Sequence, residues 1–315
     1  MVPAASHVVR SLALCALFCS AAAQAWEPTR PIQLVVGFTV GGGTDAVARA
    51  FSSASVGHIP VPIVVVNKPG AAGTLAAENV VASKGDGYTL MIGGGSESTV
   101  SPHATKVKYS LASFKAIANL VRLRVVLVVP ATGPARSFDQ YVAYAKANPG
   151  KVSFGTSGPL SQHQVSMVVL NRSAGIETTP IPFKGDSESL VAMLGGQIDA
   201  AFMSPDQVQA YVEDGRVRIL AINGDARWDQ MPGVPTFKEL GITFPIDNLK
   251  GVMAPATTPA DITDYYAVRI RQIYDSEAFK AALKRFNVEG AYMDGPTFEK
   301  NLNDISDTVK AAIAK

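Results

Sequence analysis

The run Gly41-Gly42-Gly43-Thr44-Asp45 is the feature that most constrains this chain. It follows an apolar stretch typical of a strand, Ile32–Phe38, and precedes a stretch typical of a helix, Thr44–Phe51. A glycine-rich turn between a strand and a helix leaves backbone N–H groups exposed at the helix start, where the helix dipole is also positive. This arrangement predicts a small anion site that needs no lysine or arginine.

Other readings of this turn fit less well. Thr44 or Asp45 at the helix start would also suit an ordinary N-cap. Gly41, Gly43 and Ala46 match the loose dinucleotide-binding spacing, but the second strand ends in Val66-Asn67 without the acidic residue that binds the ribose. A nucleotide P-loop is excluded, because no Gly-Lys-Ser/Thr follows.

The first 25 residues have the pattern of a cleaved secretory signal. Arg10 precedes the apolar run Ser11–Ala23, and Ala23-Gln24-Ala25 is a small-residue cleavage site. The run is too short to span a bilayer. A lipid anchor is disfavoured, because Leu14 and Phe18, rather than small residues, precede the two cysteines. We therefore expect a periplasmic protein without direct membrane insertion.

The composition of the mature chain excludes several classes of site. Removing the first 25 of 315 residues leaves 290, enough for one large or two medium domains. Both cysteines belong to the signal, so disulfides and thiolate sites are excluded. Loss of Arg10 lowers the formal net charge from +2 to +1, which gives no basic field for nucleic acid. Three scattered histidines (His58, His103 and His163) predict no metal site, and no cofactor is expected.

Strand-like and helix-like segments alternate along the mature chain. The expected strands are Ile32–Phe38, Val61–Val66, Tyr88–Ile92, Val125–Val129, Val152–Phe154, Ala200–Met203 and Val217–Ile222. The expected helices are Asp45–Ala54, Gly73–Ser83, Phe138–Ala147, Ser161–Ala174, Ser187–Leu194 and a last one whose apolar face runs from Phe298 to Ile313. Such alternation predicts an α/β fold with mostly parallel sheets, arranged as two lobes facing a cleft.

Two further loops are candidates for the same cleft. Phe154–His163 joins a short strand to a helix and offers the hydroxyls of Thr156, Ser157 and Ser161, although an ordinary capped helix start would look similar. Pro159 breaks the G-x-S-x-G pattern of a serine hydrolase. Ser96 follows another strand and could donate to a ligand, or lie in a solvated turn.

The chain resembles the extracytoplasmic solute receptors of tripartite tricarboxylate transporters, the Bug family. The resemblance covers nearly the whole mature chain and depends on the order and spacing of several short segments. They are Pro31–Val36, Gly41–Asp45, Val66–Gly73, Asp86–Leu90, Ala145–Lys151, Phe183–Gly185, Leu194–Asp199, Val234–Thr236 and Ala254–Pro255.

This resemblance implies a type II periplasmic-binding-protein fold, with lobe I at 26–125 plus 246–315 and lobe II at 126–245. It also implies a monomer that captures a carboxylate, often a dicarboxylate, through backbone N–H groups and hydroxyls, and presents it to membrane permease subunits. No catalysis is expected. The candidate ligand-binding residues are Phe38, Thr39, Gly42, Gly43, Thr44, Asp45, Ser96, Phe154, Ser157, Ser161, His163, Phe183 and Asp206.

The chain departs from the family pattern at several cleft positions. Thr39-Val40 stand where many members have Pro-Pro, Leu160 where many have glycine, Phe183 where many have tyrosine, and Leu249 where many have tryptophan. Val40, Leu160 and Phe183 favour a less polar ligand, such as an aromatic dicarboxylate like terephthalate or a longer-chain one. A receptor for a two-component sensor, an exported serine hydrolase and an exported protein without a small ligand stay open as alternatives.

Overall fold

The computed structural model describes residues 26–315 apart from 159–160, 225, 243–247, 287 and 314–315. The predicted signal peptide, residues 1–25, and Leu160 lie outside the described residues. Within the described part of the chain, no helix combines the length and the apolarity that a membrane span requires.

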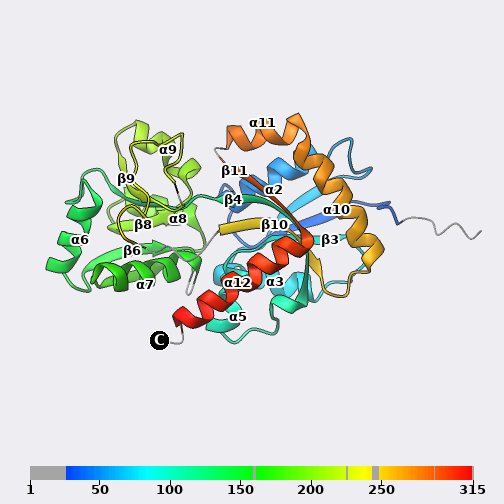
Figure 1. Ribbon diagram of the computed structural model, residues 1–315, viewed down its shortest axis with the longest axis horizontal. Helices are drawn as coiled ribbons and strands as arrows, with labels where there is room; N and C mark the ends of the chain where they lie inside the picture. Colours follow the sequence, from blue (N-terminus) through cyan, green and yellow to red (C-terminus); the bar gives the residue numbers. More distant parts are fainter. Residues whose placement is uncertain (1–25, 159–160, 225, 243–247, 287, 314–315) are drawn as a thin grey trace, which may run out of the picture.

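The chain forms two α/β lobes, each built around one sheet (Figure 1). Lobe I has a six-stranded sheet of order β11-β4-β10-β3-β1-β2. Its strands are β1 (Ile32–Val36), β2 (Ile63–Asn67), β3 (Thr89–Gly93), β4 (Phe114–Leu123), β10 (Asn248–Pro255) and β11 (Glu289–Asp294). Its helices are α2 (Gly43–Ala54), η1 (Ala71–Gly73), α3 (Thr74–Val81), α4 (Ser96–Thr99), α5 (Ser101–Ala104), η2 (Leu111–Ser113), α10 (Ala260–Asp275), α11 (Glu277–Arg285) and α12 (Gly295–Ile313).

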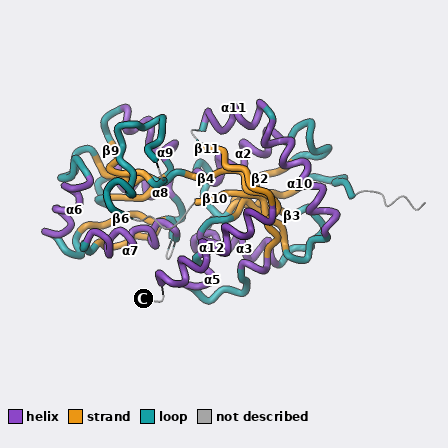
Figure 2. The backbone as a smooth tube through the Cα atoms, viewed as in Figure 1, coloured by secondary structure: helices purple, strands orange, loops and turns teal. Residues whose placement is uncertain are grey.

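Lobe II has a five-stranded sheet of order β7-β6-β8-β5-β9, which Figure 2 shows as a group of strands separate from those of lobe I. Its strands are β5 (Val126–Pro130), β6 (Val152–Thr156), β7 (Thr178–Pro182), β8 (Ala200–Met203) and β9 (Val217–Ile222). Its helices are α6 (Phe138–Ala147), α7 (Gln162–Ala174), α8 (Asp186–Leu194) and α9 (Pro205–Glu213).

Both sheets are covered on both faces, which explains the apolar runs of β1 and β5. In β1, Leu34 and Val36 join the core on one face of the lobe I sheet, whereas Val35 joins the core on the other. In β5, Leu127 and Val128 divide in the same way between the two cores of lobe II. Alternate side chains point to opposite faces of a strand, so each run fills two cores at once.

The sheets are mixed rather than mostly parallel, which corrects the expectation from the sequence. β1 pairs in parallel with β2 and β3, as consecutive βαβ units do. β10, however, runs antiparallel to both of its neighbours, β3 and β4. In lobe II, β5 runs antiparallel to β8 and β9. β5 and β10 therefore run against the direction of the βαβ strands in their sheets, whereas β4, which is antiparallel to β10, runs in the same direction as β1 and β3.

The chain passes between the lobes at Arg124-Val125, between β4 and β5. Arg124 Nε lies 2.7 Å from Glu289 Oε2 on β11, and its Nη1 donates to the Asn223 carbonyl in lobe II at 2.8 Å. Val125 N donates to Asn223 Oδ1 at 2.8 Å. One arginine therefore ties the lobes together next to the point where they meet.

Candidate functional site

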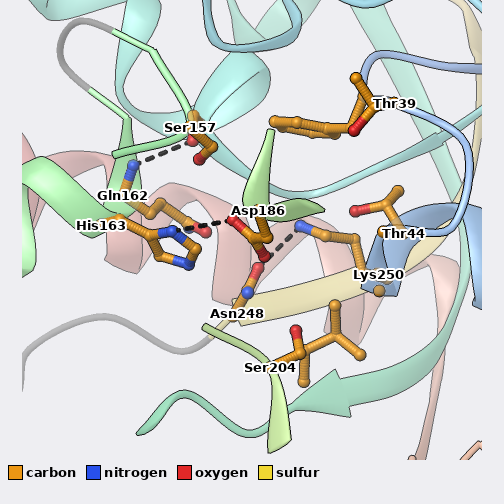
Figure 3. Close-up of a pocket in the computed structure, with 14 residues that line it drawn as sticks. Thr39, Thr44, Ser157, Gln162, His163, Asp186, Ser204, Asn248 and Lys250 are labelled. Atoms are coloured by element: carbon orange, nitrogen blue, oxygen red, sulfur yellow. Dashed lines mark hydrogen bonds and ion pairs between the residues drawn. The ribbon is translucent and has the colours of Figure 1, made fainter. Parts of the chain in front are cut away.

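A cavity lies between the lobes, and we call it the cleft cavity (Figure 3). It is small, because the volume that the centre of a water molecule can occupy in it is about 30 Å³. The residues that line it come from both lobes and from widely separated parts of the chain. They are Phe38, Thr39, Gly42, Gly43, Thr44, Ser96, Leu123, Ser157, Gln162, His163, Asp186, Ser204, Asn248 and Lys250.

The triglycine turn reaches the cavity as the start of α2. Gly42 is the N-cap residue, with extended backbone (φ −79°, ψ 161°), and no side chain of the described residues caps the helix. The N–H groups of the first turn therefore lack a side-chain acceptor of their own and lie beside the cavity. Neither Thr44 nor Asp45 acts as the N-cap.

Asp45 lies behind this turn and fixes its shape. Its carboxylate accepts from Gly41 N at 2.9 Å, Arg49 Nε at 2.8 Å and Asn67 Nδ2 at 2.9 Å. Asn67 Nδ2 also donates to the Phe38 carbonyl at 3.1 Å. Burial alone would raise the pKa of Asp45, but the hydrogen bonds from Arg49, Gly41 and Asn67 outweigh it and hold that pKa below its ordinary value. The buried carboxylate thus organises the loop from behind and does not line the cavity.

Three helices of lobe II also begin at the cavity. Gln162 and His163 form the start of α7, Asp186 is the first residue of α8, and Ser204 is the N-cap of α9. Together with α2, four helices of 9 to 13 residues have their positive ends at one small space. An anion is the ligand that such a convergence stabilises.

The lobes touch each other around the cavity. Gln162 N donates to Ser96 Oγ at 2.9 Å, and Gln207 Nε2 donates to the Gly41 carbonyl at 2.9 Å. A Cβ atom on Gly185 would lie 2.5 Å from Thr39 Oγ1, and one on Gly43 would lie 2.7 Å from Ser204 Oγ. Glycine is needed at these places because the facing lobe approaches so closely. The arrangement is therefore a closed one.

Charged and unpaired polar groups gather in the cavity. His163 Nδ1 lies 3.3 Å from Asp186 Oδ1, and Lys250 Nζ donates to Asn248 Oδ1 at 2.7 Å (Figure 3). Among the described residues, the buried atoms Thr39 Oγ1 and Gln162 Nε2 have no hydrogen-bond partner. Buried polar atoms seldom lack a partner, so these two are candidates for contact with a ligand.

Of the predicted ligand-binding residues, the structure brings eight to the cavity. They are Phe38, Thr39, Gly42, Gly43, Thr44, Ser96, Ser157 and His163. The others have different positions. Ser161 is buried and caps α7 by accepting from Gln164 N at 3.3 Å. Phe154 lies in the core on one face of the lobe II sheet, and Phe183 packs against the core on the other face of that sheet. The Asp206 side chain lies outside the described residues.

Six lining residues were not predicted from the sequence. They are Leu123, Gln162, Asp186, Ser204, Asn248 and Lys250. Helix-start signals mark three of them, because Gln162 follows a Ser N-cap, Asp186 follows Lys-Gly, and Ser204 precedes a proline. Asn248 and Lys250 carry no local signal, since both belong to a strand that the sequence pattern did not reveal.

Among the described residues, no cluster of three His, Cys, Asp or Glu side chains is placed to hold a metal ion.

Comparison with known proteins places the chain in a family. Residues 47–315 match the family described as "Tripartite tricarboxylate transporter family receptor". A UPF0065 protein from the gbd 5' region of Cupriavidus necator is 34% identical over 91% of this chain and 88% of its own length. Protein BugT of Bordetella pertussis is 31% identical over 90% of this chain and 87% of its own length.

Solved structures show the same architecture. A TctC solute-binding protein from Polaromonas without ligand is 30% identical and superposes with a TM-score of 0.69, covering 91% of this chain and 99% of its own. MatC of Rhodopseudomonas palustris with bound malate is 25% identical, with a TM-score of 0.84 and coverage of 91% and 99%. A second R. palustris protein, with adipate, is 25% identical, with a TM-score of 0.83 and coverage of 91% and 97%. The chain belongs to the Bug family of tripartite tricarboxylate transporter receptors, which are solute-binding proteins.

Proposed function

We propose that this protein captures a short dicarboxylate in the cleft cavity and presents it, with the lobes closed, to the permease subunits of a tripartite tricarboxylate transporter. The protein acts as a monomer in the periplasm and carries out no chemistry on its ligand. The observation that carries this proposal is the convergence of four helix starts on one small space between the lobes.

Helix starts suit carboxylates because their N–H groups donate charge-assisted hydrogen bonds. Each such bond contributes roughly 1.5–3 kcal/mol. Micromolar capture requires about 8 kcal/mol, so a few bonds of this kind are enough. The N–H groups of Gly43 and Thr44 bind one carboxylate, and the starts of α7 and α9 bind the other once lobe II has closed.

The comparison of TM-scores supports a closed, ligand-ready arrangement. The ligand-free Polaromonas structure is more similar in sequence than the malate-bound structure, yet it superposes less well over the whole chain. A rotation between lobes lowers a whole-chain score without altering either lobe. The higher TM-score with the malate-bound structure is therefore expected if the two lobes of this chain are arranged as they are in that structure.

The size and lining of the cavity favour a short aliphatic ligand over an aromatic one. Val40, which prompted the expectation of an apolar cleft, is 64% exposed, and Phe183 does not line the cavity. Phe38 and Leu123 are the large apolar side chains on its wall within the described residues. One related structure contains malate and another contains adipate. We propose that the chain length of the ligand lies between these two.

Thermal unfolding in the presence of carboxylates tests this function. We expect succinate, malate or adipate to raise the stability by about 2.7 kcal/mol at a hundredfold excess over Kd, and acetate and leucine to have little effect. A larger shift with terephthalate would restore the aromatic ligand. The absence of a shift with every carboxylate, or hydrolysis of an ester by the protein, would contradict the receptor function.

A further inference from the structure

Lys250 is a buried lysine on the wall of the cleft cavity. It lies on β10 and is 3% exposed, and Figure 3 shows its side chain turned toward the cavity. An ammonium group has three N–H donors. One of them reaches Asn248 Oδ1 at 2.7 Å, on the same face of the strand. Lysine side chains are seldom fully buried unless they are paired with an opposite charge or an acceptor.

The nearest charges explain only part of this burial. Glu97, 1% exposed, accepts from Gly95 N at 2.9 Å and Ser98 Oγ at 3.0 Å through Oε1. Its Oε2 has no hydrogen-bond partner among the described residues. A Cβ atom on Gly95 would lie 2.5 Å from Lys250 Nζ and 2.9 Å from Glu97 Oε2, so both groups border the same short stretch of backbone.

Asp186 faces the same space from lobe II. Burial lowers the pKa of Lys250, while the negative charges of Glu97 and Asp186 oppose that shift. His163, which pairs with Asp186, is the remaining titratable side chain on the cavity wall among the described residues. Without Lys250, the cavity and its border would hold two carboxylates and no fixed positive charge. A dianion would then meet repulsion as well as the helix starts.

We propose that Lys250 pairs with one carboxylate of the ligand and sets the preference of this receptor for dianions over monoanions. The inference rests on the proposed function and deepens it. Lys250 supplies a point charge at the β10 side of the cavity, whereas the start of α2 supplies backbone N–H groups. One carboxylate of the ligand then meets the start of α2, and the other meets Lys250 together with the starts of α7 and α9. This use of a side-chain cation departs from recognition by backbone and hydroxyl groups alone.

The test compares dicarboxylates with their monoamides, which keep the shape and lose one charge. Calorimetry measures the affinity of the protein for succinate, malate and adipate and for the monoamide of each. For the best of the three, we expect the unaltered protein to prefer the dianion by about tenfold to a hundredfold. In Lys250→Met this preference falls to less than threefold. Lys115→Met, a lysine on the neighbouring strand β4 that does not line the cavity, keeps the full preference.

The single variant could misfold, because it leaves the buried Glu97 carboxylate without the nearby lysine. The double variant Lys250→Met/Glu97→Gln avoids this, because it removes both buried charges together. It too should lose the preference. If the unaltered protein binds none of the dicarboxylates, the proposed function fails. If it binds them and the preference survives in a folded Lys250 variant, the function stands and the role of Lys250 is refuted.

Discussion

The two faces of the cleft cavity are held in place in different ways. Lobe I presents backbone N–H groups at the start of α2, held from behind by the buried Asp45 carboxylate, together with side chains that include Lys250. Lobe II presents side chains at the starts of α7, α8 and α9, among them His163 and Asp186, which pair with each other. The lobe I face is fixed by contacts within its own lobe, whereas the lobe II face is placed against it by contacts between the lobes.

Under the proposed function, this difference predicts an order of binding. A preorganised surface loses little conformational entropy on binding, so lobe I is suited to take the first carboxylate. Lobe II then completes the site through contacts such as Gln162 N to Ser96 Oγ. Changes at the lobe contact should affect binding and leave folding almost unchanged, while changes behind the α2 start should affect both.

The largest effect is expected from a side chain that keeps the lobes apart. Gly185→Val places a Cβ where it would lie 2.5 Å from Thr39 Oγ1, and the extended backbone (φ 177°) accepts any residue. Overpacking of this kind costs about 1–3 kcal/mol, so we expect the affinity for the dicarboxylate to fall by up to about a hundredfold. Calorimetry measures this loss, and the urea midpoint should stay near that of the unaltered protein.

Gly233→Val is the matched control, because no atom lies within 4 Å of a Cβ at that position. Equal affinities for the two variants would show that the contact between Gly185 and Thr39 is not used in binding.

The next largest effect concerns the support of the lobe I face. Asp45→Asn weakens the bonds to Gly41 N, Arg49 and Asn67, and we expect it to lower the free energy of unfolding by about 1–3 kcal/mol and also the affinity. Asp86→Asn, which removes an exposed pair with Arg30, should change the stability by less than about 1 kcal/mol. Similar losses in both variants would mean that Asp45 does not organise the turn.

The same carboxylate predicts a pH dependence. The pKa of Asp45 is lower in the folded state than in the unfolded chain, so its contribution to stability is fully present above about pH 5. That contribution is lost as the pH falls through the lowered pKa of the folded state. Urea unfolding between pH 7 and pH 3 should therefore show a smaller loss of stability in Asp45→Asn than in the unaltered protein. Parallel curves would contradict the assignment.

The smallest effect is expected at a single hydroxyl on the lobe I face. Thr39 Oγ1 is buried, lines the cavity and has no hydrogen-bond partner within the described chain. Thr39→Val keeps the shape and removes the donor, so we expect a threefold to tenfold loss of affinity, about 0.5–1.5 kcal/mol. Stability should not fall, because no protein hydrogen bond is lost. Unchanged affinity would place the hydroxyl outside the contact with ligand.

Local patterns predicted much of the fold. α6 spans Phe138–Ala147 as expected, and Ser137 caps it by accepting from Gln140 N. The period of four and three residues between Phe298 and Ile313 corresponds to α12. The direction of β5 and β10 was not predicted, because strand direction depends on where the chain re-enters a sheet and not on the sequence of that strand.

The sequence by itself determined that a glycine-rich turn would open a helix with exposed N–H groups, because that geometry depends on neighbouring residues alone. It also located several strands, β1 and β5 among them, through their apolar runs. Only the tertiary structure decided that Lys250 lies buried in the same cavity as that turn. Gly251 on β10 pairs with Gly93 on β3, although 158 positions separate them in the sequence. This pairing places β10, and with it Lys250, inside the lobe I sheet. The burial of a charge depends on what the rest of the chain places around it.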